Sequence, residues 1–348
     1  MLVQLLMLAF VYTEMRKLFL IIICILCGFT AVAQYDAQFS NYWATTGFFN
    51  PANAGRSGNL EGMSLYRQQW LGIKGAPGTV LILADMPMNF LGRTHGVGAV
   101  IYSEKIGLFN HSIISAQYAY KKEIGNGTFS AGIQAGYITE SFKGSRIDPK
   151  VINDDYHEET DPGIPTSDVT GAGVDAAFGL MFYKPKWYVG LSITHLLGAE
   201  LELGESYIME IPRAYYLTGG YNIQLRNPLL ELRPSFLIKT TEMGSSVPGD
   251  SIIGDAMKAM MTMTQVDLSL RMIYNKTYWG GLGWRKGDAA TLMFGGKFSM
   301  VEAGYAYDFP ISTMLKGSTG SHEIFLKFII DLDKRKGKKN KHKSVRIL

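Results

Sequence analysis

Long segments of this sequence alternate between apolar residues and small or polar residues. The clearest segment is 264–274, whose first face holds Val266, Leu268, Leu270 and Met272. Its second face holds Gln265, Asp267, Ser269 and Arg271. The same alternation occurs in 187–194, 301–308 and 323–331. A repeat of two residues predicts β-strands with two different faces, so the fold is all-β. A soluble sandwich and an outer-membrane barrel share this pattern, because a barrel turns its apolar face to lipid and its polar face to the lumen.

The number and length of the alternating segments favour the barrel. We count fourteen predicted strands, and most approach the roughly nine to eleven residues that a tilted membrane strand requires. Strands of soluble proteins average about five or six residues. The predicted strands are 58–70, 78–86, 96–104, 110–122, 127–140, 171–183, 187–196, 213–224, 230–239, 263–274, 277–285, 289–297, 299–309 and 321–331. Only 18% of the 348 residues are charged, and no apolar run past residue 33 approaches the roughly 20 residues of a spanning helix.

The connections between the predicted strands differ in length in a regular way. Those after the fifth, seventh and ninth strands are long (141–170, 197–212 and 240–262), and those after the sixth, eighth and tenth are short. Outer-membrane barrels have long external loops and short periplasmic turns. We therefore expect a transmembrane antiparallel β-barrel of about fourteen strands, and an even strand count places both termini in the periplasm. Two connections depart from the pattern, since 87–95 is long for a turn and 286–288 is short for a loop.

The first thirty-three residues have the composition of a signal peptide. Arg16 and Lys17 precede an apolar stretch, and Ala31-Val32-Ala33 is a small-residue cleavage site. We expect translation to start at Met15 and export to the outer membrane. The sequence's 2 cysteines, Cys24 and Cys27, lie in this segment. The expected mature chain therefore has no disulfide, thiol nucleophile or cysteine metal site.

Three motifs occur in order along the expected mature chain. The first comprises 34–42 (QYDAQFSNY) and 50–55 (NPANAG), the second 66–70 (YRQQW) and 75–79 (GAPGT), and the third 304–308 (GYAYD) and 320–324 (GSHEI). Their order and spacing resemble the PorP/SprF family of outer-membrane barrels, which is associated with type IX secretion and gliding motility. The resemblance implies an accessory role without catalysis, either anchoring periplasmic machinery or helping a cargo adhesin reach the surface. It also implies outer-membrane lipid, periplasmic secretion components and a secreted cargo as partners, and no nucleic acid.

The residues themselves predict four regions: the signal peptide 1–33, an irregular segment 34–57, the barrel 58–331 and a tail 332–348. Turn-forming Asn-Pro and Ala-Gly steps make 34–57 a periplasmic or lumenal segment. Polar residues on the lumen faces of strands are candidates for a lumenal site: Arg67, Asp267, Arg271, Glu302, Asp308 and Glu323. Arg67 has Glu302, Asp308 and Glu323 as possible partners, with simple solvation as the alternative. An arginine at Ser269, which is predicted to face the lumen, is expected to destabilise the barrel much less than an arginine at Leu268, which is predicted to face lipid.

The tail concentrates the positive charge of the chain. Residues 334–348 contain 8 lysines and arginines, whereas the expected mature chain before them holds 24 basic and 29 acidic residues. Such a run is either a solvated end or a contact for an acidic periplasmic partner, anionic lipid or a polyanionic surface polymer. The candidate contact residues are Lys334, Arg335, Lys336, Lys338, Lys339, Lys341 and Lys343.

The sequence offers little chemistry of an enzyme. The 6 histidines show no metal-ligand spacing, and His322 is interpreted as a hydrogen-bonded structural residue. No nucleophile elbow and no calcium loop are present, so we expect no cofactor, no metal and no catalysis. Two alternatives remain open at this point. One is a passive channel or small-solute transporter of the same architecture, and the other is a soluble carbohydrate-binding sandwich.

Overall fold

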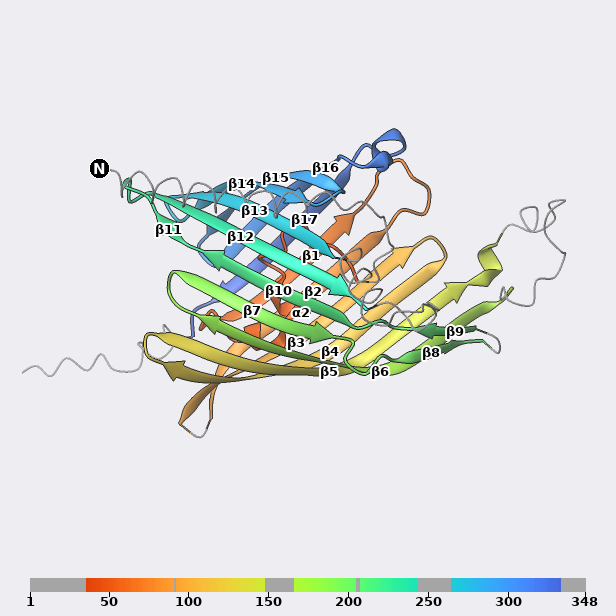
Figure 1. The fold of residues 1–348 in the computed structure, drawn as a ribbon, viewed down its shortest axis with the longest axis horizontal. Coiled ribbons are helices and arrows are strands. Elements are labelled where there is room, and N and C mark those ends of the chain that lie inside the picture. Colours follow the sequence, from red (N-terminus) through yellow and green to blue (C-terminus); the bar gives the residue numbers. More distant parts are fainter. Residues whose placement is uncertain (1–35, 91, 148–165, 205–206, 243–263, 333–348) are drawn as a thin grey trace, which may run out of the picture.

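The computed structural model describes residues 36–90, 92–147, 166–204, 207–242 and 264–332. Fourteen antiparallel strands form a closed barrel, because β1 pairs with β17 and β10 pairs with β12 (Figure 1). The strands are β1 (Leu60–Gln68), β2 (Gly78–Phe90), β3 (Arg93–Ile106), β4 (Phe109–Ile124), β5 (Gly127–Lys143), β6 (Asp168–Tyr183), β7 (Trp187–Thr194), β10 (Ala214–Tyr221), β12 (Leu230–Thr241), β13 (Gln265–Tyr274), β14 (Tyr278–Arg285), β15 (Ala289–Phe298), β16 (Val301–Pro310) and β17 (Ser321–Ile330). The predicted fold class is confirmed.

Short elements lie outside this ladder. A separate hairpin of β8 (Glu200–Leu203) and β9 (Tyr207–Glu210) lies between β7 and β10, and β11 (Ile223–Gln224) extends the pairing of β12. Single turns of 3-10 helix, η2 (Gly144–Arg146) and η3 (Thr313–Lys316), lie in two of the connections. Within the described residues, no helix is long and apolar enough to cross a membrane.

The two ends of the barrel differ in the length of their connections. At one end, here called the turn end, most strands are joined by two or three residues, as at 91–92, 125–126 and 184–186. At the other, here called the loop end, the connections include 69–77, 144–167, 195–213 and 242–264. The prediction of a long connection at 87–95 was wrong. Pro87 and Asn89 are of types common in turns, but they lie in β2, opposite Gly96 and Thr94 of β3. The connection between β2 and β3 is therefore short, as expected for the turn end. The other departure from the predicted pattern stays, since 286–288 is a short connection at the loop end.

The outer surface of the barrel is apolar and exposed. In β13, Leu268 and Leu270 are 45% and 46% exposed, whereas the alternate residues Asp267, Ser269 and Arg271 are buried inside. In the alternating segments 187–194 and 323–331, apolar residues of the outer face are also exposed, namely Val189, Leu191, Leu326 and Phe328. A continuous apolar surface around a closed barrel is stable in lipid, because the ladder satisfies the backbone polar groups and leaves no edge.

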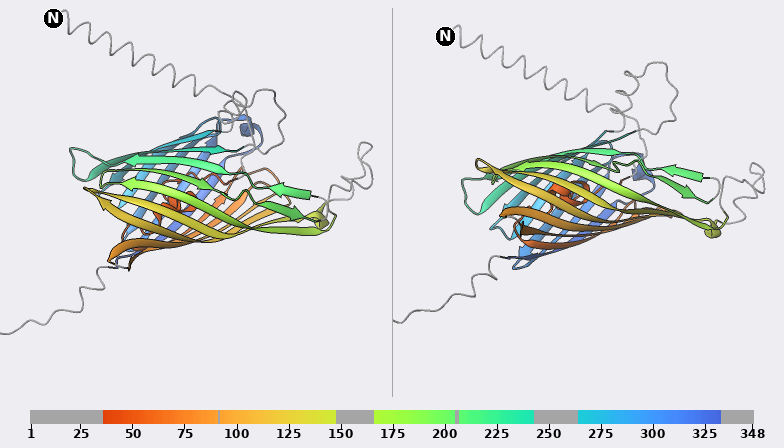
Figure 2. Two further views of the ribbon diagram at one scale, coloured as in Figure 1. Left: turned by 60° about the horizontal axis from the view of Figure 1, so that its bottom comes forward. Right: turned by 90° about the horizontal axis from the view of Figure 1, so that it is seen from below.

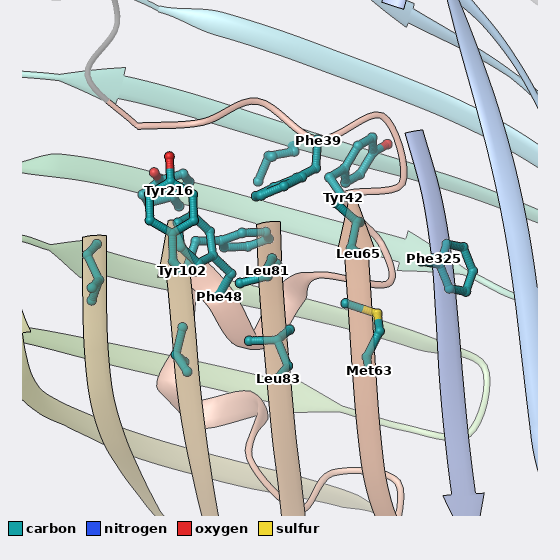
Figure 3. Packing of buried hydrophobic residues seen from close by; sticks show 14 of the residues in the cluster. Phe39, Tyr42, Phe48, Met63, Leu65, Leu81, Leu83, Tyr102, Tyr216 and Phe325 are labelled. Carbon is teal, nitrogen blue, oxygen red and sulfur yellow. The ribbon is translucent and has the colours of Figure 1, made fainter. Parts of the chain in front are cut away.

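Residues 36–57, here called the plug, fill the lumen instead of standing beside the barrel (Figure 2). The plug contains the one-turn helix α2 (Thr46–Phe49) and the 3-10 turn η1 (Pro51–Asn53). Its aromatic residues Phe39, Tyr42 and Phe48 pack against Leu65, Leu81 and Tyr102 of the inner wall (Figure 3). The plug therefore supplies the centre of the hydrophobic core.

The plug runs along the barrel from the loop end to the turn end. Asp36 contacts His195, which directly follows the loop-end terminus of β7, and Arg56 lies over Tyr183 and Tyr188 at the turn end. Strand β1 then begins at the turn end, where Leu60 pairs with Ile330. The even strand count therefore places the first and last strand termini at one end, whereas the first described residue lies towards the opposite end.

Candidate functional site: the plugged lumen

A buried ion-pair cluster joins the plug to β1, β16 and β17. Arg67 Nη2 lies 2.7 Å from Asp308 Oδ2, and Arg67 Nη1 lies 3.2 Å from Glu323 Oε2. Ser40 of the plug donates its backbone N–H to Glu323 Oε2 and its hydroxyl to Asp308, at 2.8 and 2.7 Å. Asn41 donates its backbone N–H to Glu323 Oε1 at 2.8 Å. The carboxylates therefore hold the arginine and the plug at the same time.

This arrangement selects among the partners that the sequence allows for Arg67. Asp308 and Glu323 both reach it, and all three residues are almost fully buried, so Arg67 is not a solvated surface residue. Glu302 does not join them, because it lies near the turn end of β16, opposite Lys327 and Lys297. Alternation placed Glu302 and Asp308 on one face, but six residues of strand separate them by about 20 Å.

Arg285 extends the same cluster and was missed from the sequence. Its Nε lies 2.7 Å from Asp267 Oδ1, and its Nη1 lies 3.1 Å from Asp288 Oδ2 and 3.4 Å from Asp308 Oδ2. The two-residue alternation along the strand could have identified this arginine as a lumenal residue, because Gly281, Gly283 and Arg285 fall on one face of β14. The intervening glycines gave that face no recognisable polar character. The predicted residue Asp267 thus belongs to this cluster through Arg285.

A second buried cluster holds the beginning of the plug. Asp36 Oδ1 lies 2.8 Å from His195 Nε2, and His195 Nδ1 lies 3.0 Å from Asp175 Oδ2 on β6. Tyr216 donates its hydroxyl to the Asp36 carboxylate, and Lys239 donates to the backbone oxygen of Asp36 at 2.7 Å. We call these five residues the Asp36 latch.

The electrostatics of the Asp36 latch favour the charged forms of both Asp36 and His195. Burial alone would raise the pKa of Asp36, but the charges of His195 and Lys239 and the hydrogen bonds to it lower that pKa below its usual range. Burial alone would lower the pKa of His195, but the carboxylates of Asp36 and Asp175 raise it to about 10. At neutral pH the histidine is therefore a cation between two carboxylates.

The middle of the plug is held by aromatic and hydroxyl contacts. The guanidinium carbon of Arg271 lies 3.4 Å from the ring centroid of Trp43, which also packs edge-on against Trp279 at 5.2 Å. Tyr42 donates its hydroxyl to the backbone oxygen of Ser235 at 2.8 Å and to Ser269 Oγ at 3.1 Å. Arg271 thus faces the lumen and is covered by the plug. Ser269 is equally covered, so an arginine at this position would be buried against the plug instead of being solvated in an open lumen.

Glycines of the inner wall allow the plug backbone to approach closely. A Cβ atom at Gly132 of β5 would lie 2.3 Å from the backbone N of Ala52, and one at Gly96 of β3 would lie 1.9 Å from the backbone O of Ala54. A Cβ at Gly179 of β6 would meet Asn50 Oδ1 at 2.1 Å. Any larger residue at these positions would overlap the plug, so the wall is shaped for this segment.

A cavity of about 340 Å³ lies between the plug and the barrel wall in the turn-end half of the lumen. Its charged lining residues are Arg56, Glu61, Asp85, Arg233 and Lys327. Lys327 pairs with Glu61 at 2.5 Å, and Asp85 accepts the backbone N–H of Gly55 at 2.6 Å.

The remaining residues singled out in the sequence lie outside these clusters and this cavity. His322 Nδ1 lies 2.5 Å from the Tyr305 hydroxyl oxygen, and the seven basic tail candidates from Lys334 to Lys343 are outside the described residues.

Structural comparison finds outer-membrane barrels of low sequence identity. The CymD monoaromatic hydrocarbon channel is 12% identical, with 85% of this chain and 94% of that chain covered at a TM-score of 0.47. A TodX ΔS2S3 mutant monoaromatic hydrocarbon channel is 10% identical (81% and 93% covered, TM-score 0.43). BamA from Haemophilus ducreyi lacking POTRA domains 1–3 is 9% identical (78% and 70% covered, TM-score 0.42). These likenesses are too distant to carry an argument about function.

A comparison with curated protein sequences found no match. The model of the family described as type IX secretion system membrane protein PorP/SprF matches residues 31–328, which is most of the sequence. The fold agrees with that match, since a closed barrel with an apolar outer surface is the architecture of an outer-membrane protein. The chain therefore belongs to the PorP/SprF family of outer-membrane proteins of the type IX secretion system.

Proposed function

We propose that this protein is an accessory component of type IX secretion that acts by binding other proteins, without catalysis and without conducting solutes. It would either anchor periplasmic parts of the secretion machinery at the outer membrane or help a cargo adhesin reach the surface. The observation that carries the proposal is the occupation of the lumen by residues 36–57. A conducting pore needs a continuous water-filled path along the lumen, and here the plug occupies the lumen and contacts wall residues such as Arg67 and Arg271.

The pairing of the lumenal charges supports a role without catalysis. Arg67 is held by Asp308 and Glu323, and Arg285 is held by Asp267 and Asp288. Buried charges that already satisfy one another have little capacity left to bind or polarise a substrate. The contacts of the Glu323 carboxylate with Ser40 and Asn41 instead favour a structural role, which is to fix the plug and the shape of the barrel ends.

The position of the last strand supports a contact through the basic tail. Strand β17 ends at Ile330, at the same end as the short turns. Short turns face the periplasm in outer-membrane barrels, so the residues from Lys334 onward would begin on that side. An acidic periplasmic component of the machinery would be attracted to them, and salt would weaken the attraction.

Cross-linking of outer membranes followed by recovery of the protein tests this proposal. We expect the full chain to recover other type IX secretion components, and a variant truncated before Lys334 to recover less at low salt. The difference should shrink as salt rises, because screening removes the contribution of the tail. The control is heat-modifiable migration of the truncated variant, which shows that the barrel is intact. Recovery of no secretion component by the full chain would overturn the binding role, and equal recovery by both chains would remove the tail from it.

A further inference from the structure

The hairpin of β8 and β9, here called the ribbon, is fixed at the loop end of the barrel (Figure 1). Strand β7 pairs with β6 only from Phe178 to Tyr183, so the rest of β6 continues past it. The ribbon packs on that continuation. Leu201 and Leu203 of β8 are 0% and 1% exposed, and a Cβ atom at Gly171 of β6 would lie 2.7 Å from the backbone O of Glu202. One side of the ribbon is therefore anchored on a close-fitting surface.

The other side of the ribbon has an open strand edge. Within the described residues, the ribbon is a sheet of its own, and β9 pairs only with β8. No backbone hydrogen bond joins the outer edge of β9 to another described element. An open edge on a rigid support is a template to which an extended segment of another chain can add as a strand.

The side chains of the ribbon indicate what such a segment would carry. The register places Glu200 directly opposite Glu210, and Glu202 lies beside them opposite Ile208. All three glutamates are exposed, and no lysine or arginine of the described chain forms an ion pair with them. Like charges directly opposite each other destabilise a strand pair. A partner that brings positive charge to this face would remove that repulsion.

The apolar residues of the ribbon indicate what the other residues of an added strand would be. Ile208 and Tyr207 are 59% and 47% exposed, and Tyr207 lies on the face opposite the glutamates, together with Met209. Neighbouring residues of an added strand point to opposite faces. Basic residues at every second position would lie beside Glu210 and Ile208 of β9, with Glu200 and Glu202 of β8 one strand further on. Apolar residues between them would lie beside Tyr207 and Met209. An anionic lipid surface does not suit this face, because the glutamates would repel it.

We propose that the ribbon is a docking site for an extended segment of a partner protein in which lysine or arginine alternates with apolar residues, added as a strand along β9. The inference goes beyond the accessory role in secretion and does not rest on it, because the ribbon would bind such a segment in the purified protein. It assigns the loop end of the barrel a partner chemistry distinct from that of the basic tail.

Peptide binding to the purified full chain in nanodiscs tests the proposal. The probe is a labelled peptide of alternating lysine and valine, and fluorescence anisotropy reports its binding. The controls are a peptide of the same composition with its lysines and valines in two blocks, and an alternating peptide with N-methylated backbone amides. We expect the alternating peptide to bind about tenfold more tightly than either control, since only it has both the charge pattern and the backbone donors.

Variants of the ribbon complete the test. The double variant Glu200→Gln with Glu210→Gln should bind the probe about tenfold more weakly, since two charge pairs are lost. Its thermal midpoint should equal or exceed that of the wild type, because the repulsion is gone, and this excludes misfolding as the cause. Glu123→Gln at the turn end is the matched control and should bind normally. Equal binding by the double variant, or by the block peptide, would overturn the proposal. Quenching of an Ile208→Trp variant by brominated lipid without any peptide binding would also overturn it.

Discussion

Arg67 and Asp308 form an almost fully buried ion pair, 2.7 Å between Nη2 and Oδ2, and both contact the hydroxyl of Ser40 in the plug. Removing one partner of a buried pair leaves an uncompensated charge. We expect Arg67→Ala to lower the free energy of unfolding by about 3–5 kcal/mol, measured by thermal and denaturant unfolding in detergent. Arg226→Ala, at an exposed position in the 222–229 connection, is the control and should change stability by less than about 0.5 kcal/mol. Equal effects would mean that the cluster does not hold the plug.

The backbone contact between Gly132 and Ala52 gives a second prediction. A Cβ atom at Gly132 would lie within 2.6 Å of three backbone atoms of Pro51 and Ala52, so the wall or the plug must move. We expect Gly132→Ala to cost about 1–3 kcal/mol and to make the plug accessible to protease. The matched control is Gly62→Ala on β1, since a Cβ atom there would have no neighbour within 4 Å. An unchanged thermal midpoint for Gly132→Ala would show that the plug does not press against this part of the wall.

The Asp36 latch predicts a loss of stability at alkaline pH. The folded pKa of His195 is raised to about 10, above an unfolded value of about 6.5. Its contribution is therefore complete below about pH 6.5 and is lost as the pH rises through about 10. Asp36 and Asp175 face His195, and Tyr216 and Lys239 contact Asp36, so deprotonation leaves carboxylates without their cation. We expect the wild type to lose thermal stability between pH 7 and pH 10, and His195→Gln to lose less. Parallel curves for the two proteins would contradict this role.

The outer face of β13 gives a test of the membrane orientation. Leu268 is exposed on the barrel surface, and an arginine there would face hydrocarbon. We expect Leu268→Arg to cost about 2–4 kcal/mol on folding into lipid. Leu229→Arg, at an exposed position in the 222–229 connection, is the control and should fold nearly normally. If the control costs as much as Leu268→Arg, then Leu268 does not lie in the membrane interior.

Much of the barrel could be predicted from the sequence, because a repeat of two residues is a local property. Alternation identified the exposed face of β13 and the buried positions of Asp267 and Arg271 without any knowledge of their partners. The boundaries were less predictable where local signals conflicted with pairing. Pro87 and Asn89 belong to β2 because the β2–β3 hairpin continues to Phe90 and Arg93, whatever their turn propensity.

The plug could not be predicted in the same way. Residues 36–57 show neither helical nor strand periodicity over a useful length, and their position depends on partners far away in the sequence. Ser40 contacts Asp308 across 268 positions, and Tyr42 contacts Ser269 across 227. The sequence therefore predicts only that this segment is periplasmic or lumenal, and it gives no sign that the plug covers Ser269. Only the closed barrel shows that the lumen face of β13 is covered by Tyr42.

Single-channel conductance of the purified protein in planar bilayers tests most directly the claim that the plug closes the lumen. Flotation of proteoliposomes first confirms that each protein is inserted. We expect the wild type to be silent. A variant lacking residues 36–55, with its signal peptide retained, should conduct, because the wall residues around Arg67 and Arg271 then line an open path. A steady open channel in the wild type, of the same conductance as the deletion variant, would show that the plug does not close the lumen.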